Sequence, residues 1–421
     1  MAWLALLALA ALAPACMGFL SPMTQQARAS ALHLSSRSAE LSMSAGKALI
    51  VQNKGGGHGE LGYHLANILQ EKGVEVTLLQ DSAAKKAKQP FASYGELESK
   101  GVKVVWGDFA GEGGVGASLP SDEAFDYVFD NYAKDPATAK DVAVAAKSWS
   151  VKNYVYVSSA GMYKNTEEVP LVETDAVKET GQRQVELMAE EMGLPWTSFR
   201  PQYIYGPLTN KRDYLDWFYD RVVWAMSPFP LPHHGDQFVA ITHAEDVASM
   251  LAAVVGNPSA VGQIFNCAST RYITYNALAK SVAKACGQDP SDISHRYYKP
   301  ADYGAEKGYF PFRENHFFVS SDKAVRLLGW QPKHDLLQDL EWYRDSYVAA
   351  GKADTPPDFL KDDEINIIDP EYVPWTVRRQ LAEENPELEQ QLTSIRDKMN
   401  ELDKYYYSGM LEQLKEEHAQ A

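Results

Sequence analysis

Short apolar runs recur along the first half of the chain, and amphipathic stretches separate several of them. The runs cover residues 48–51, 74–79, 102–106, 125–129, 154–157 and 196–199. Apolar residues recur at helical spacing over residues 61–69, and residues 135–150 and 177–192 also have a helical pattern. Strands that alternate with helices in this way predict a parallel sheet covered by helices on both faces. The expected fold class is therefore α/β, with a doubly wound Rossmann domain over residues 47–207.

The regular alternation ends near residue 207, where aromatic residues and prolines become frequent. We expect residues 208–350 to form a smaller C-terminal α/β lobe that packs over the mouth of the first domain. Residues 351–374 are rich in proline and acidic residues, which predicts a linker. Residues 375–421 have apolar side chains at helical spacing, which predicts a helical tail. This tail is either a solvated helix folded back on the body or a helix that binds a partner.

The N-terminal residues have the composition of targeting segments. Residues 2–13 form an apolar run too short to span a bilayer, and small residues follow it, which predicts a signal peptide over residues 1–18. Residues 19–46 are rich in serine and alanine, and arginine outnumbers acid there, as in transit peptides. This order resembles the bipartite presequences that direct proteins to complex plastids. We therefore expect a plastid protein, and the alternative is a secreted protein with a serine-rich linker.

The stretch after the first apolar run has the order of a dinucleotide-binding unit. A helical pattern follows a glycine turn, and a second apolar run then ends at Asp81; the glycines are Gly56, Gly57, Gly59 and Gly62. Glycine lets the backbone approach a pyrophosphate, and the helix N-terminus beyond it attracts anions. Asp81 follows Gly62 by 19 residues, near the spacing at which an acid binds an adenosine ribose. NAD or NADP is the expected cofactor, and the alternative is an αβ fold that binds none.

Composition narrows the classes of partner. The formal net charge of the 421 residues is −16, so a nucleic acid would have to bind a local cationic patch rather than the protein's overall field. The hydrophobic content of 45% is that of a globular protein with a sizeable core. The three cysteines, Cys16, Cys267 and Cys286, provide neither a disulfide framework nor the spacing of a metal site.

Further motifs link the glycine pattern to a known superfamily. In chain order they are Gly107-Asp108, Ser158-Ser159 with Tyr163, Arg200-Pro201, Tyr205-Gly206-Pro207, His243 with Asp246, and Leu328-Gly329-Trp330. Over residues 48–350 the sequence thereby resembles the extended short-chain dehydrogenases/reductases of the epimerase/dehydratase type. Redox members of this superfamily use a serine and a Tyr-x-x-x-Lys pair, in which the tyrosine is the acid/base.

The resemblance implies that Ser159 and Asp108 contact the cofactor. Lys178 and Gln182, however, stand where the tyrosine and lysine of the redox pair would be. Without a phenol of lowered pKa, hydride transfer has no proton partner. We therefore do not expect redox activity.

A second resemblance is more specific. The segments that carry it are Gly55-Gly56-Gly57-His58, residues 158–164, residues 199–203, residues 217–221, and Phe312-Arg313 with His316-Phe317. They are similar to those of the chloroplast stem-loop-binding proteins, type a above all. The resemblance implies a plastid RNA-binding protein that stabilises or processes chloroplast transcripts or rRNA. It also implies Mg²⁺-dependent endoribonuclease activity and association with ribosomes or transcription complexes.

Candidate metal ligands follow from the predicted sheet. Asp81, Asp108 and Asp130 each stand at the carboxyl end of a predicted strand, and those ends line one crevice in a doubly wound sheet. Carboxylates that hold Mg²⁺ could stabilise the leaving oxygen during phosphodiester cleavage, which would make these residues catalytic. In the alternative, Asp81 binds a ribose, Asp108 lies beside an adenine and Asp130 forms a turn.

Candidate RNA contacts follow from the distribution of cations. Single-stranded RNA binds where cations alternate with aromatic faces. The candidate cations are Lys85, Lys86, Lys88, Lys211, Arg212, Arg221 and Arg313. The alternative is that these cations are solvated and that the aromatic residues near them belong to the core.

Two other functions stay open. The first is an NAD(P)-dependent epimerase or reductase, against which the missing Tyr-x-x-x-Lys pair argues. The second is a non-catalytic scaffold that joins a ribosome, a transcription complex or a photosynthetic complex through its acidic tail. A homo-oligomer or hetero-oligomer is compatible with each of these functions.

Overall fold

Seven parallel strands form the central sheet of the computed structural model, which describes residues 45–53, 55–209, 211–304, 308–370, 372–375 and 377–379. In spatial order they are β3 (Lys103–Gly107), β2 (Glu75–Asp81), β1 (Lys47–Gln52), β4 (Tyr127–Asn131), β5 (Asn153–Val157), β6 (Trp196–Pro201) and β11 (Gln263–Cys267). The chain begins in the interior of the sheet at β1, runs to the β3 edge, and then continues from β4 towards the other edge. This order creates a switch point between β1 and β4, where ligands bind in open α/β sheets.

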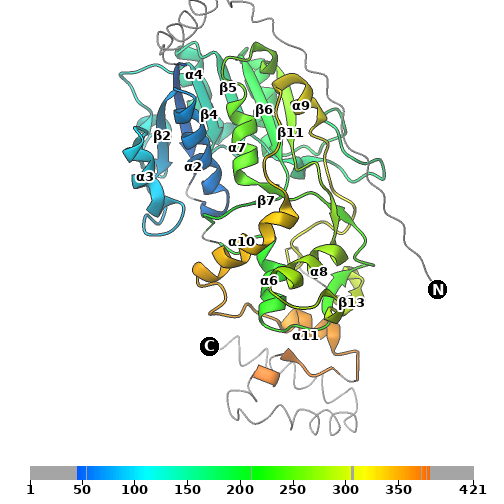
Figure 1. Cartoon of the computed structure of the whole chain (residues 1–421). Helices are drawn as coiled ribbons and strands as arrows, with labels where there is room; N and C mark the ends of the chain where they lie inside the picture. Colours follow the sequence, from blue (N-terminus) through cyan, green and yellow to red (C-terminus); the bar gives the residue numbers. More distant parts are fainter. Residues whose placement is uncertain are drawn as a thin grey trace, which may run out of the picture. The chain divides into compact units, whose positions relative to one another are not determined.

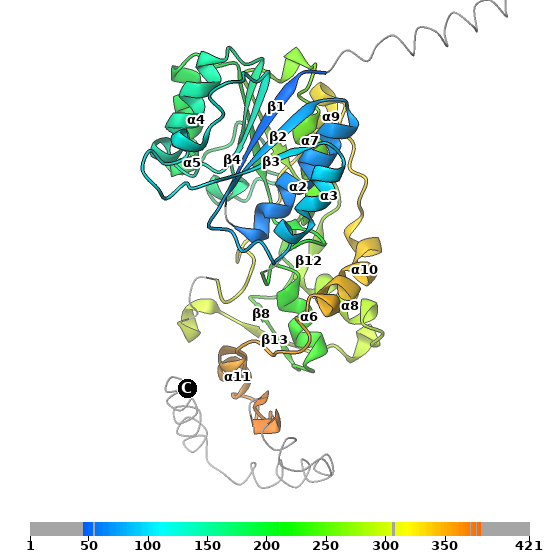
Figure 2. The same ribbon diagram turned by 90° about the vertical axis from the view of Figure 1, so that its left-hand side faces the viewer.

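Helices cover both faces of the sheet because successive strand residues point to opposite sides. Ala48 and Ile50 of β1 belong to an apolar cluster formed with α2 (Gly56–Glu71), α3 (Tyr94–Ser99), α7 (Ala244–Ala252) and α9 (Asp322–Leu328). Leu49 and Val51 join α4 (Pro136–Ser148) and α5 (Gly181–Glu191) on the opposite face. Figure 2 shows the two helix layers on either side of the strands. The predicted doubly wound α/β fold is thus confirmed.

Local capping fixes where the helices that border the site begin. Asp135 accepts a hydrogen bond from the Thr138 N–H at 2.9 Å, which starts α4 directly after β4 and its loop. Thr180 caps α5 in the same way, through the Arg183 N–H at 3.2 Å. The predicted helix over residues 177–192 therefore begins only at Gly181.

A second core lies outside the main sheet (Figure 1). It joins α6 (Asp216–Val223), α8 (Tyr275–Ala285), α10 (Leu336–Ala349), and the parallel strands β8 (Phe229–Pro232) and β13 (His295–Tyr298). Short pairs complete this region: β7 (Ile204–Tyr205) with β10 (Thr242–His243), and β9 (Phe238–Val239) with β12 (Ile273–Thr274). The short 3₁₀ helices are η1 (Phe91–Ser93), η2 (Gly116–Ser118), η3 (Ala160–Met162), η4 (Pro258–Ala260), η5 (Pro290–Asp292) and η6 (Pro300–Tyr303).

The predicted boundary at residue 207 does not match this arrangement. After residue 207 the chain returns to the first domain, because β11 pairs with β6 and α7 packs against α2. The short strand and helix in this stretch were recognised in the sequence, but their pairing partners are distant in the chain. The Rossmann domain and the smaller lobe are therefore interleaved in sequence.

The predicted linker over residues 351–374 also differs from the structure. This segment contains α11 (Leu360–Asn366), in which Asp362 and Ile365 are fully buried. Asp362 forms an ion pair with Arg221 at 2.7 Å, and farther along the chain the Trp375 indole donates a hydrogen bond to the Trp224 carbonyl. The acidic residues that suggested a solvated linker are thus partly buried partners of the smaller lobe.

Other predictions fall beyond the described part of the chain. The signal peptide, the transit peptide up to residue 44, and the tail beyond residue 379 lie outside the described residues. Within the described ranges, none of the helices combines the length and apolar character needed to cross a bilayer.

Candidate functional site

A cleft of about 730 Å³ opens at the carboxyl ends of the parallel strands. Its sheet side is lined by residues that follow the strands, among them Asn53, Asp81, Asn131, Ser158 and Pro201. Its opposite side is lined by Lys211, Tyr214, Arg313 and Phe317. A second cavity of about 650 Å³ shares Asn53, Gly55, Ile204, Lys211 and Tyr214 with it. The two cavities together place the switch point of the sheet opposite a cationic and aromatic wall.

The glycine turn reaches the cleft at Gly55. Gly56, Gly57 and Gly59 form the first turn of α2, and Gly55 is the N-cap residue. The Asn53 side chain accepts a hydrogen bond from the Gly55 N–H at 2.6 Å. A Cβ on Gly62 would lie 2.5 Å from Oε1 of Gln52, so a larger residue there would require the Gln52 side chain to move. The helix N-terminus therefore faces a cleft suited to an anion.

The three candidate aspartates have different surroundings. Asp81 is 8% exposed, lines the cleft and accepts a hydrogen bond from the Ala83 N–H at 2.9 Å. Asp108 is exposed and caps a turn by accepting from the Ala110 and Gly111 N–H groups. Asp130 is fully buried and accepts from the Tyr132 and Ala133 N–H groups and from the Tyr154 hydroxyl.

These surroundings contradict the predicted metal set. In the described ranges, Asp81, Asp108 and Asp130 do not bring their carboxylate oxygens together as a group of metal ligands. The oxygens of Asp130 are already hydrogen-bonded, and burial raises the pKa of this carboxyl above its usual value. The strand-end rule placed all three aspartates at the correct edge of the sheet, but it did not predict which side chain faces the cleft. Asp81 alone of the three lines it.

His243, His334 and Asp339 do bring their ligand atoms within 4.8 Å of one another. The two imidazole rings, however, are stacked with centroids 3.5 Å apart and an interplanar angle of 10°. Nδ1 of His243 accepts a hydrogen bond from the Glu245 N–H, and Nδ1 of His334 lies 2.9 Å from Asp339. Nitrogen lone pairs lie in the ring plane, so stacked rings do not converge on one ion. We interpret this cluster as a structural contact that joins the start of α7 to α10.

The redox machinery is incomplete at the cleft. Ser159 lines the cleft and caps η3 by accepting from the Gly161 N–H at 3.0 Å. Gln182 also lines the cleft, whereas Lys178 precedes α5 and lines a neighbouring cavity. Gln182 therefore lies on α5, whereas Lys178 does not.

No other phenol in the lining can replace the missing tyrosine. Tyr132, Tyr203 and Tyr214 line the cleft, and burial raises the pKa of each above its usual value. An acid/base tyrosine of a reductase needs a lowered pKa. The residues present therefore suit the binding of a dinucleotide, through Asp81 and the α2 N-terminus, but do not suit hydride transfer.

Arg313 is the cation most firmly fixed at the cleft. Its guanidinium donates hydrogen bonds to the carbonyl oxygens of Gly161 and Tyr163 and to the Asn165 side chain. It also lies 3.8 Å from the centroid of the Phe317 ring. All of these partners are neutral, so the positive charge stays available to an anion in the cleft. Burial lowers the pKa of Arg313 from its usual very high value, and an arginine remains charged in proteins.

The other predicted RNA-binding cations divide into two groups. Lys211 is exposed and lines both cavities, and the side chains of Lys85, Lys86 and Lys88 are exposed in the turn after β2. Nζ of Lys86 lies 4.3 Å from the centroid of the Trp106 ring. Lys134, which the sequence did not single out, is exposed and lines the cleft just after β4. Its position behind a strand end was the signal that could have identified it.

Arg212 and Arg221 line the second cavity, but each is already paired with an acid. Arg221 is 3% exposed, and its charge is paired with Asp362 at 2.7 Å. Arg212 pairs with Asp220 and donates to the carbonyl oxygens of Lys352 and Thr355. Their aromatic neighbours suggested an RNA surface, but the acids that neutralise them come from distant parts of the chain or from the buried face of α6.

Comparison with solved structures agrees with this architecture. An epimerase from Methanothermobacter thermautotrophicus superposes with a TM-score of 0.57 at 20% identity, over 75% of this chain and 96% of the other. A UDP-glucose 4-epimerase from Thermotoga maritima, solved with UDP-glucose, gives 0.55 at 20% identity, over 72% and 99%. A dTDP-glucose 4,6-dehydratase from Bacillus anthracis, solved with NAD, gives 0.57 at 13%, over 73% and 97%. At these identities the likeness establishes the fold.

Sequence comparison is more specific. The model of the NAD dependent epimerase/dehydratase family matches residues 55–268. The chain is 35% identical over 335 residues to the chloroplast stem-loop binding protein of 41 kDa b from Arabidopsis thaliana, a match that covers 77% of this chain and 85% of the relative. Type a stays a prediction, since this relative is of type b. The chain therefore belongs to the NAD dependent epimerase/dehydratase family and, within it, to the chloroplast stem-loop binding proteins.

Proposed function

We propose that the mature protein binds stem-loop RNA in the plastid and holds an unpaired segment of it in the cleft. The observation that carries this proposal is that Lys134, just after β4, lines the cleft together with the wall formed by Lys211, Arg313, Tyr214 and Phe317. In the part of the chain that the structure describes, no ion pair joins these three cations to a carboxylate. Their charge is therefore available to phosphates, although the whole protein is acidic.

The same wall suits single-stranded RNA better than a duplex. Bases of an unpaired segment can stack on aromatic faces, whereas those of a helix are already stacked on each other. Tyr214 is the partly exposed ring, and it stacks on Phe312 with ring centroids 5.8 Å apart, whereas Phe317 is buried beneath the Arg313 guanidinium and supports that cation. These rings are held in place before a ligand arrives, which lowers the entropic cost of binding. The name of the Arabidopsis relative supports RNA as the ligand.

Cleavage of RNA is not part of the proposal. Metal-assisted cleavage needs carboxylates that converge on one ion, and Asp81, Asp108 and Asp130 each have separate partners. Association with a ribosome or a transcription complex would follow from RNA binding, but no contact in the structure bears on it. We therefore restrict the proposal to binding and protection of the transcript.

Affinity for a labelled stem-loop RNA tests this proposal in matched variants. Arg313→Gln removes the fixed guanidinium and is expected to weaken binding about tenfold, the effect of one charge-assisted contact. Arg326→Gln is the control. Arg326 is exposed on α9, away from the cleft, and its substitution changes the net charge by the same amount. Equal affinity of the two variants would contradict the proposed binding site.

Dinucleotide binding without turnover is a second candidate function. It is favoured by the position of Asp81 at the end of β2 and by the Gly55 N-cap at the cleft. NADH and NADPH fluorescence titrations are expected to show saturable binding that Asp81→Asn weakens for NADH about tenfold. Reduction of added carbonyl substrates should stay at background. Turnover at a measurable rate would instead support the epimerase or reductase alternative.

A further inference from the structure

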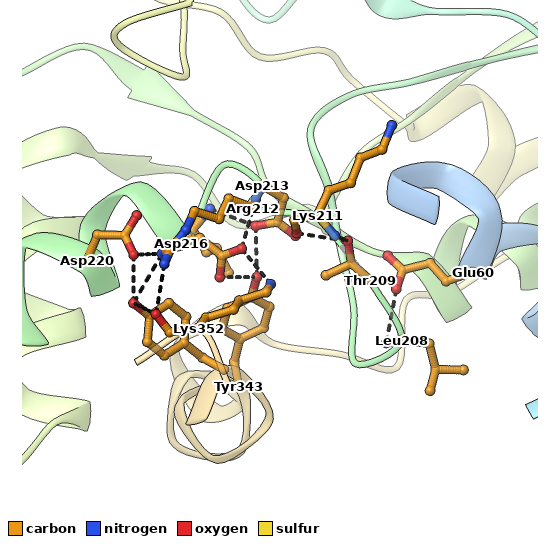
Figure 3. A network of polar contacts seen from close by, with 12 residues as sticks. Glu60, Leu208, Thr209, Lys211, Arg212, Asp213, Asp216, Asp220, Tyr343 and Lys352 are labelled. Atoms are coloured by element: carbon orange, nitrogen blue, oxygen red, sulfur yellow. Dashed lines mark hydrogen bonds and ion pairs between the residues drawn. The ribbon is translucent and has the colours of Figure 1, made fainter. Parts of the chain in front are cut away.

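Behind the cationic wall lies a network of buried acids. Lys211 and Tyr214, which face the cleft, flank Asp213 in the segment that leads into α6. Figure 3 shows the Lys211 side chain directed away from the cluster of Asp213, Asp216 and Tyr343. The segment is thus fastened on one side by this cluster and exposes its cation on the other.

Hydrogen bonds within the network hold the start of α6. The Asp213 N–H donates to Asp216 at 2.8 Å, and the Leu215 N–H donates to Asp213 at 3.1 Å. Lys352 donates to Asp216 at 2.6 Å, from the chain that follows α10. Any repulsion between Asp213 and Asp216 would therefore act directly on the residues that carry Lys211 and Tyr214.

The Tyr343 hydroxyl lies between the carboxyl groups of Asp213 and Asp216. The Tyr343 hydroxyl oxygen lies 2.8 Å from Oδ1 of Asp213 and 3.1 Å from Oδ1 of Asp216. A hydroxyl has one hydrogen, which bonds well to one of these oxygens. An ionised Asp213 therefore places a second negative charge beside Asp216, and the single hydroxyl hydrogen cannot compensate both.

Burial and the nearby acid Asp216 favour a protonated Asp213, whereas Lys352, Tyr343 and the Leu215 N–H oppose it. Asp216 on α6 and Glu60 on α2 are fully buried acids, and Tyr343 on α10 is neutral. Lys352 is the opposing cation, and its side chain is 11% exposed. Glu60 accepts a hydrogen bond from the Leu208 N–H, so the same segment is also tied to α2. One lysine therefore faces three carboxyl groups.

We propose that a proton on Asp213 holds the cleft wall that carries Lys211 and Tyr214, so that RNA affinity falls when this proton is lost. The inference rests on the proposed RNA binding and adds its regulation by pH. Burial and the charge of Asp216 raise the pKa of Asp213 to about 7, against the opposing effects of Lys352 and Tyr343. The transition thus falls near neutrality, and the weaker binding is on its alkaline side.

RNA affinity as a function of pH tests this inference. At constant ionic strength, the wild type should bind a labelled stem-loop RNA about threefold or more weakly at pH 8 than at pH 6, within the tenfold per pH unit that one proton allows. Asp213→Asn keeps the shape of the protonated carboxyl and should retain the low-pH affinity throughout. Asp236→Asn is the control, because Asp236 lies in an exposed loop, and its RNA affinity should change with pH as in the wild type.

A second variant keeps the inference testable if Asp213→Asn fails to fold. Tyr343→Phe removes a hydrogen bond that lowers the pKa of Asp213, so the midpoint of the affinity curve should shift to higher pH. If RNA affinity depends on pH in the same way in the wild type, Asp213→Asn and Tyr343→Phe, the inference is wrong, although the proposed RNA binding stands.

Hydrogen exchange separates this failure from failure of the proposed function. In the wild type, exchange over residues 208–216, corrected for intrinsic rates, should become faster from about pH 6 to about pH 8, but not in Asp213→Asn. If no RNA binds at any pH, the proposed function is wrong. The exchange data then still test whether loss of the proton loosens residues 208–216. Identical exchange in both proteins would overturn the inference.

Discussion

Two arginines show how the same residue type acquires different roles. Arg221 and Arg313 both lie among aromatic residues, and the sequence predicts RNA contact for each. Arg221 is buried and paired with Asp362, whereas Arg313 lines the cleft and bonds to neutral oxygens only. The difference comes from the acid that the fold brings to one of them from a distant part of the chain. A cation is a candidate for binding only when its charge stays uncompensated.

His334 gives a pH dependence that belongs to a single residue. Burial alone would lower its pKa, but the hydrogen bond to Asp339, the charges of Asp246 and Asp339, and the bond to Glu245 outweigh burial and raise it. A raised folded-state pKa stabilises the protein fully below the unfolded value of about 6.5, and this stabilisation is lost as pH rises through the folded value.

The difference in unfolding free energy between the wild type and His334→Gln should therefore be largest near pH 6 and smaller at pH 8. Urea unfolding at several pH values measures it. His234→Gln is the control, since His234 is exposed and lies away from the Asp339 cluster. A difference that grows as pH rises would contradict the charged role of His334.

Part of the site was predictable from residue order. The glycines, Asp81 and Ser159 lie at or beside the cleft because strand ends of a doubly wound sheet share one edge. The partners of Asp130 and Arg212 were not predictable, because they depend on side-chain direction and on long-range packing. Lys134 was not among the predicted RNA contacts, although its position just after β4 could have indicated it.

At the scale of elements, α11 shows that composition alone can mislead. Its segment has the prolines and acids of a linker, yet Asp362 and Asp363 are buried against the smaller lobe. Tyr372 and the Trp375 N–H donate to Asp363, so these acids satisfy donors rather than face water. The strands and helices of the central sheet were predicted well because each carries its own apolar period. The return of β11 and α7 to that sheet is a matter of topology, which local periodicity does not encode.

Removing one partner of the α11 ion pair should be costly. Asp362→Ala leaves the Arg221 charge buried and unpaired, and we expect the unfolding free energy to fall by about 3 kcal/mol. Chemical denaturation measures this loss. The double variant Arg221→Met with Asp362→Leu removes both charges and should recover most of it. Loss of stability equal to that of the single variant would show that the pair matters through its specific geometry rather than through burial of charge.

The whole molecule is acidic, with a net charge of −16, yet it is proposed to bind a polyanion. The charge of the cleft is nevertheless locally positive, because Lys134, Lys211 and Arg313 line it and form no ion pairs with acids in the described ranges. Long-range repulsion would then slow the approach of RNA, while short-range contacts would hold it. The strength of binding should accordingly depend on how many phosphates these cations contact.

The salt dependence of RNA binding shows whether these three cations hold the phosphates of the RNA. The affinity of the mature protein for a stem-loop RNA is measured from about 50 to about 300 mM salt, and the logarithm of the binding constant is plotted against the logarithm of salt concentration. Three phosphate contacts to a single strand predict a slope of about −2. The variant with Lys134→Gln, Lys211→Gln and Arg313→Gln should bind weakly with a slope near zero. A wild-type slope that this triple variant preserves would place the RNA elsewhere and contradict the account.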